Sequence, residues 1–126
     1  MRPVTILYVE DSEDLRETIA MLLESPEREV KTCATGEEAL ACYAEHEYDI
    51  LVTDVGLPGL SGTDLARKLL AQKPDRWVVL CSGYEFSEHL HLFGPNVRAV
   101  RKPFEPEDLE ALMAQIIDRI NASSQG

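Results

Sequence analysis

Short apolar runs alternate with longer amphipathic stretches along the chain. Four runs are almost continuously apolar or β-branched, as expected for strands covered on both faces: Thr5–Val9, Ile50–Thr53, Trp77–Cys81 and Val97–Val100. A fifth run, Val30–Ala34, includes the charged Lys31 and follows Glu29, which favours a strand at the edge of a sheet. The pattern therefore predicts five strands.

The stretches around these strands have apolar residues at helical spacing. Five helices are expected: after Ser12, from Thr35 to about Ala44, from Ser61, at Ser87–Leu92, and from Pro106 to about Ile120. The first helix is expected to be capped by Ser12, to turn Leu15, Ile19, Leu22 and Leu23 inward, and to end at Ser25-Pro26. Thr35 and Glu38 have the spacing of a capping box.

Strands that alternate with helices predict an α/β fold, a doubly wound parallel sheet of five strands with five helices. The length of 126 residues suits one domain with a sufficient core. We expect that domain at residues 1–122 and a polar tail at residues 123–126.

Composition narrows the classes of function. A formal net charge of −11 argues against direct binding of nucleic acid, whose phosphates this surface would repel. No run approaches the ~20 apolar residues of a membrane helix, and the start, Met1–Val4, lacks a signal-peptide core, so a cytoplasmic location is expected. Cys33, Cys42 and Cys81 are expected to be free thiols, because their number is odd and no CxxC spacing occurs.

A different polar residue follows each of four predicted strands: Glu10-Asp11, Asp54, Ser82 and Lys102. Carboxyl ends of parallel strands share one edge, where open α/β sheets bind ligands. Acids, a hydroxyl and a lysine at one edge suit the binding of a divalent cation such as Mg²⁺ and the transfer of a phosphoryl group to a carboxylate. Each residue alone also fits an ordinary role: a turn-capping acid, a solvated helix start, a surface lysine or a simple turn.

Together these residues resemble the receiver domain of response regulators in bacterial two-component signalling. The resemblance extends from Ile6 to about Ile120. Its motifs are Tyr8–Ser12, Thr35–Leu40, Asp49–Asp54 with Leu57–Gly62, and Lys102–Phe104. The family implies a flavodoxin-like sheet with strand order 2-1-3-4-5.

The resemblance also implies a role for each matching residue. Asp54 would accept a phosphoryl group from the phosphohistidine of a sensor histidine kinase or phosphotransfer protein. Asp11, Asp54 and the carbonyl of Gly56 would ligate Mg²⁺, with Glu10 assisting through a water. Ser82 and Lys102 would contact the phosphoryl group, and a cis bond would precede Pro103. The phosphorylated domain would then control a downstream effector, as a switch that catalyses only its own phosphorylation and dephosphorylation.

Two departures and two competing functions remain. Ala99 stands where the family usually has an aromatic switch residue, and Tyr84 or Phe86 could replace it. Gly56 and Tyr84 stand at positions that in this family tune the loss of the phosphoryl group. A Mg²⁺-dependent phosphatase with an aspartyl nucleophile is one alternative, although Gly56 stands where such enzymes usually carry a second aspartate. A phosphorylation-independent interaction module is the other. His89 and His91 are more consistent with surface residues than with a metal site, because no third ligand is evident.

Overall fold

A computed structural model describes residues 3–83 and 93–125. Five strands form one parallel sheet in the order β2-β1-β3-β4-β5. They are β1 (Val4–Val9), β2 (Arg28–Cys33), β3 (Ile50–Asp54), β4 (Trp77–Ser82) and β5 (Val97–Arg101). The predicted parallel sheet and its strand order are confirmed, and β2 is an edge strand as its charges indicated.

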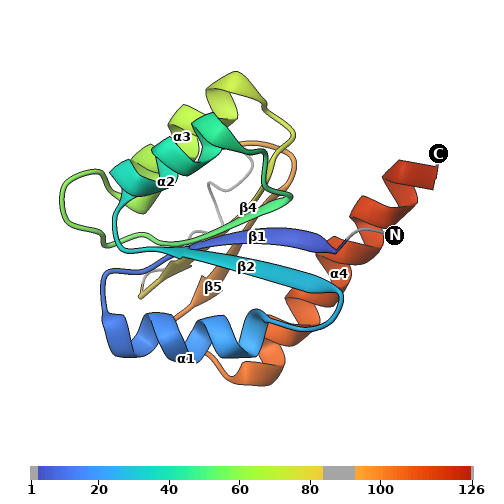
Figure 1. Cartoon of the computed structure of the whole chain (residues 1–126), viewed down its shortest axis with the longest axis horizontal. Coiled ribbons are helices and arrows are strands. Elements are labelled where there is room, and N and C mark those ends of the chain that lie inside the picture. The colour runs from blue at the N-terminus through green and yellow to red at the C-terminus, as the bar shows by residue number, and fades with distance from the viewer. Residues whose placement is uncertain (1–2, 84–92, 126) are drawn as a thin grey trace.

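Helices cover both faces of this sheet. They are α1 (Glu13–Leu23), α2 (Gly36–Glu45), α3 (Gly62–Gln72) and α4 (Pro106–Gln125). Helices α2 and α3 lie on one face, and α1 and α4 lie on the other (Figure 1). The described residues thus contain four helices rather than the five expected, and the helix expected at residues 87–92 falls outside them.

The core is divided by the sheet into two layers. Leu7, Leu51 and Leu80 are fully buried on the side of α2 and α3. Their strand neighbours, including Ile6 and Ile50, are equally buried on the side of α1 and α4. Because successive strand residues point to opposite faces, a strand covered on both faces must be apolar at every position.

Three local expectations are corrected by the structure. Leu22, expected to face the core, is 37% exposed, because it lies beside the inward-facing stripe that includes Ile19 and Leu23. Ser12 precedes α1 as expected, but its side chain makes no capping hydrogen bond. Helix α4 continues to Gln125, beyond the end expected at about Ile120, because no proline or glycine interrupts it before Gly126.

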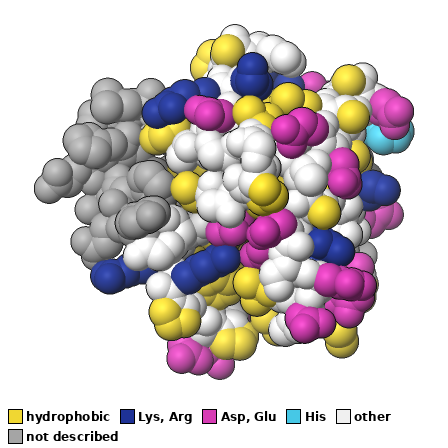
Figure 2. Space-filling view, turned by 90° about the vertical axis from the view of Figure 1, so that its left-hand side faces the viewer, with side chains coloured by type: hydrophobic (Ala, Val, Ile, Leu, Met, Phe, Trp, Pro, Cys, Tyr) yellow, Lys and Arg dark blue, Asp and Glu magenta, His cyan; other side chains and the backbone are white. Residues whose placement is uncertain are grey.

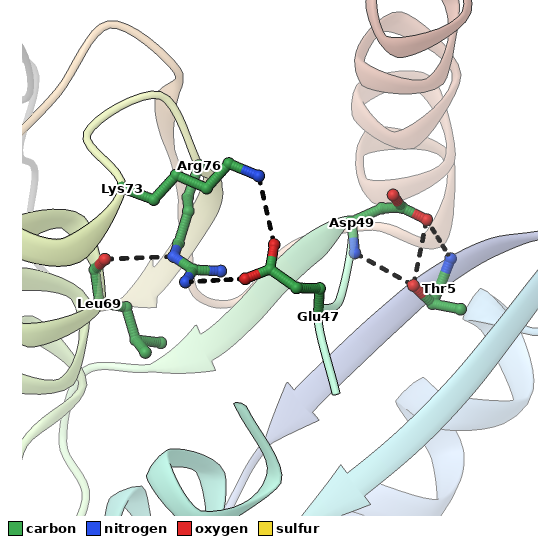
Figure 3. Close-up of polar contacts among 6 residues, drawn as sticks. All are labelled: Thr5, Glu47, Asp49, Leu69, Lys73 and Arg76. Atoms are coloured by element: carbon green, nitrogen blue, oxygen red, sulfur yellow. Dashed lines mark hydrogen bonds and ion pairs between the residues drawn. The ribbon is translucent and has the colours of Figure 1, made fainter. Parts of the chain in front are cut away.

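A polar network joins segments at the amino ends of the strands (Figure 3). Asp49 accepts hydrogen bonds from the backbone N–H and the hydroxyl of Thr5, at 2.8 and 3.0 Å. Glu47 bridges Lys73 and Arg76, at 3.2 and 3.3 Å. These contacts fix the chain before β3 and β4, at the end of the sheet opposite the predicted site.

The helices were compared in length and apolar content with a membrane-spanning helix. Within residues 3–83 and 93–125, none of the helices is both long enough and apolar enough to span a membrane.

Candidate functional site

The carboxyl ends of β1 and β3 bring three acids together. Glu10, Asp11 and Asp54 each offer a carboxylate oxygen, and these oxygens lie within 4.8 Å of one another. We call these three residues the acidic cluster. Figure 2 looks onto this edge of the sheet and shows acidic side chains gathered near its centre, beside basic side chains. The predicted convergence of Glu10, Asp11 and Asp54 is thus present in the structure.

Asp54 is held by the strand that ends with it. It is the last residue of β3, pairs in register with Cys81 of β4, and is 9% exposed. Its backbone carbonyl accepts a hydrogen bond from the Thr53 hydroxyl at 2.9 Å. A side chain at Gly62 would collide with the same carbonyl oxygen, so glycine allows α3 to begin directly against Asp54.

Glu10 is the most buried member of the acidic cluster. It is 2% exposed, and its carboxylate accepts a hydrogen bond from the Ser12 backbone N–H at 3.2 Å. Burial, a hydrogen bond with Asp11 and the charge of Asp54 raise the pKa of Glu10 above its ordinary value, although the Ser12 N–H and Lys102 oppose this. Glu10 therefore gains more from a nearby cation than an exposed acid would.

Lys102 supplies one positive charge to the acidic cluster. Its Nζ atom lies 3.0 Å from Asp54 Oδ1 and 3.2 Å from Glu10 Oε1. Burial of the ammonium acts to lower the pKa of Lys102, but the hydrogen bond and charge of Asp54, with Glu10, outweigh it and raise the pKa. The Lys102-Pro103 peptide bond is cis, as the resemblance implied.

Two more predicted residues surround this centre. Ser82 ends β4, is 3% exposed, and its carbonyl accepts the Lys102 N–H at 2.7 Å. Gly56 lies exposed in the loop after β3, with no atom within 4 Å of the position that a Cβ would occupy.

Ala99, which stands where the family usually has an aromatic residue, lies in β5 opposite Leu80. Tyr84, Phe86, His89 and His91 fall outside the described residues.

One supporting residue was missed by sequence reasoning. The Arg16 guanidinium donates to the backbone carbonyl of Glu10 at 2.9 Å, and thus ties the first turns of α1 to the acidic cluster. Arg16 has no motif of its own, and only its position on the inward-turned side of α1 brings it to Glu10. This hydrogen bond fixes the backbone at Glu10, from which one carboxylate of the acidic cluster extends.

The donor set fits a small divalent cation. Three carboxylates offer hard oxygen ligands, and a single ammonium leaves the group with an excess of negative charge. Mg²⁺ prefers such oxygen ligands and keeps several waters, so the exposed side of Asp11 and Gly56 suits it. The residues that could hold the ion are Glu10, Asp11, Asp54 and the carbonyl of Gly56.

Comparison with known families decides the identity of this arrangement. Residues 6–114 match the response regulator receiver domain. The chain belongs to this family. It is therefore a receiver domain of the two-component response regulators, and the acidic cluster lies where the family's phosphorylation site is expected.

Individual relatives agree with this assignment. The two-component response regulator PhoP of Pseudomonas aeruginosa is 33% identical over 116 residues, which cover 90% of this chain and 52% of PhoP. The chain spans about half the length of the curated relatives it matches.

Solved structures agree as well. The response regulator TrrA of Thermotoga maritima, in complex with Mg²⁺ and BeF, has a TM-score of 0.79 and 27% identity, covering 90% of this chain and 98% of TrrA. The chemotaxis response regulator CheY4 of Vibrio cholerae has a TM-score of 0.80 at 24% identity, covering 90% of this chain and 98% of its own, which shows the shared fold.

Proposed function

We propose that this receiver domain accepts a phosphoryl group on Asp54 from the phosphohistidine of a sensor histidine kinase or phosphotransfer protein, with Mg²⁺. The observation that carries the proposal is the position of Asp54, 3.0 Å from Lys102 Nζ and within 4.8 Å of two further acids. A carboxylate next to one fixed cation and a site for a second can receive a phosphoryl group without building up uncompensated charge.

The transfer follows from these positions. A carboxylate oxygen of Asp54 attacks phosphorus, the P–N bond of the phosphohistidine breaks, and the imidazole leaves with its electron pair. Glu10, Asp11, Asp54 and the Gly56 carbonyl would hold Mg²⁺, which would supply charge neutralisation at the phosphoryl oxygens. Lys102 moves its hydrogen bond from the Asp54 carboxylate to a phosphoryl oxygen, and Ser82 donates its hydroxyl to another. Glu10 and Asp11 would remain in place to hold the cation.

The proposed output is a change of conformation that controls a downstream effector. Lys102 connects the site to β5, because the residue follows this strand directly and its N–H is bonded to Ser82 at the end of β4. Movement of Lys102 from the Asp54 carboxylate to the phosphoryl group would therefore act on the ends of both strands. The segment expected to move in place of an aromatic residue at Ala99 runs through residues 84–92, which fall outside the described residues. The chain would catalyse only its own phosphorylation and dephosphorylation.

An aspartyl-nucleophile phosphatase has less support. Such an enzyme needs a general acid close to its nucleophile, and the position two residues after Asp54 is Gly56. A glycine offers no proton to a leaving group.

Phosphorylation of the purified chain tests the proposal. Incubation with phosphoramidate or acetyl phosphate and Mg²⁺ should add one phosphoryl group, measured as intact mass, and EDTA should prevent it. Asp54→Asn should stay unmodified. Asp118→Asn, an equal change of charge on the exposed side of α4, is the control and should behave like the parent. Modification of Asp54→Asn at the parent rate would show that Asp54 is not the acceptor.

A further inference from the structure

Two of the three cysteines lie against each other. Cys33 ends β2 and Cys42 lies in α2, and their Sγ atoms are 3.6 Å apart. Cys81, by contrast, is buried in the core layer on the opposite face of the sheet. We call Cys33 and Cys42 the thiol pair. Both thiols are free, as expected from the sequence.

The thiol pair is close to the geometry of a bond. A sulfur–sulfur bond of about 2.05 Å requires the two Sγ atoms to approach by roughly 1.5 Å, which side-chain rotation and a small movement of the end of β2 and α2 toward each other can supply. Cys42 is half-buried, whereas Cys33 is 4% exposed. An oxidant therefore reaches Cys42 first. Cys33, which is buried and has its Sγ 3.6 Å from that of Cys42, is placed to attack the Cys42 sulfur once that sulfur is oxidised.

We propose that Cys33 and Cys42 form a reversible disulfide when the protein meets hydrogen peroxide, and that this bond weakens cation binding at the acidic cluster. The Cys42 thiolate attacks one peroxide oxygen, the O–O bond breaks, and a sulfenic acid and hydroxide result. The Cys33 sulfur then attacks the Cys42 sulfur, loses its proton and displaces hydroxide, so that one disulfide and two waters form in total. A thiol donor restores the pair.

One backbone hydrogen bond connects the thiol pair to the acidic cluster. The backbone carbonyl of Cys33 accepts the N–H of Glu10 at 3.0 Å, beside the register pair of Val9 with Cys33. Drawing the end of β2 toward α2 lengthens this hydrogen bond and displaces Glu10. Supporting hydrogen bonds of this kind orient the ligands of a metal. Complete loss of such a partner typically costs about 10–100-fold in metal affinity. Because this hydrogen bond would be lengthened rather than lost, we expect oxidation to lower Mg²⁺ affinity by less, roughly threefold to tenfold.

Thiol counting tests the bond itself, independently of phosphorylation. The full chain is treated with hydrogen peroxide, unfolded and labelled with N-ethylmaleimide. The expected product has lost two hydrogens, carries label on Cys81 alone, and yields a peptide in which Cys33 is linked to Cys42. Cys33→Ser and Cys42→Ser should form no intrachain bond, while Cys81→Ala should oxidise like the parent. Full labelling of Cys33 and Cys42 after peroxide would overturn the proposal.

Mg²⁺ titration of the reduced and oxidised chain, followed by NMR, tests the coupling. This step rests on the proposed metal site, so titration of the reduced chain separates the two ideas: no binding there would contradict the proposed function, whatever the cysteines do. The oxidised parent should bind more weakly, and dithiothreitol should restore its affinity. Peroxide should not change the affinity of Cys42→Ser. Equal affinities of reduced and oxidised parent would refute the link between the thiol pair and Glu10.

Discussion

Removal of the Lys102 ammonium should destabilise the metal-free protein and strengthen its binding of Mg²⁺. Lys102→Ala leaves all three members of the acidic cluster in place. It removes the cation that lies 3.0 Å from Asp54 and 3.2 Å from Glu10. Since Glu10 is 2% exposed, its carboxylate then loses a close partner in a place that water hardly reaches.

The size of both effects follows from burial. Loss of one partner of a fully buried ion pair costs about 3–5 kcal/mol. The side chain of Lys102 is 28% exposed, so water screens part of the interaction, and we expect the free energy of unfolding to fall by about 2 kcal/mol. Loss of a positive charge from this partly screened site should make the free energy of Mg²⁺ binding more favourable by about 1 kcal/mol, or about fivefold in affinity.

Urea unfolding at pH 7, followed by circular dichroism with EDTA and with Mg²⁺, measures both effects. The variant should unfold earlier than the parent in EDTA and gain more stability from Mg²⁺. Lys68→Ala, which removes an equal charge from the exposed side of α3, should match the parent. Addition of beryllofluoride with Mg²⁺ should no longer cause long-range NMR shifts in Lys102→Ala. Equal unfolding midpoints in EDTA, or weaker Mg²⁺ binding by the variant, would refute this reasoning.

Three further predictions concern the support of the site and the opposite end of the sheet. Gly62→Ala should cost about 1–3 kcal/mol in urea unfolding and weaken Mg²⁺ binding, because its Cβ meets the Asp54 carbonyl; an unchanged midpoint would contradict this. Arg76→Ala should cost about 2 kcal/mol, because Arg76 is 9% exposed and bonds the Leu69 carbonyl; parent-like unfolding would contradict this. The hydrogen bond from Lys73 and, to a smaller extent, the charge of Arg76 lower the pKa of Glu47 below 4.5. The stabilisation that Glu47 gives the fold is therefore present above pH 4.5 and is lost as the pH falls through the lowered pKa. In urea unfolding over this pH range, Glu47→Gln should lose less stability than the parent.

The alternation of apolar runs and helical stripes was enough to predict the parallel sheet and the polar residues that lie together at its carboxyl edge. Strands buried on both faces must be apolar throughout, so an acid or lysine directly after such a strand marks the place where it leaves the core. This local rule located Glu10, Asp54 and Lys102 from the sequence. The family motifs then supplied the strand order and the cis bond before Pro103, both confirmed by the structure.

Only the tertiary structure decided the energetics of that edge, because they depend on contacts between residues far apart in the chain. Residue type does not reveal that Glu10 is almost completely buried, or that one ammonium is shared by Glu10 and Asp54. Helix spacing alone placed Leu22 in the core, but the curvature and packing of the sheet decide how wide the buried stripe of α1 can be. The contact of Cys33 with Cys42 likewise arises only when α2 packs beside the end of β2, which brings together two thiols that have no recognisable spacing.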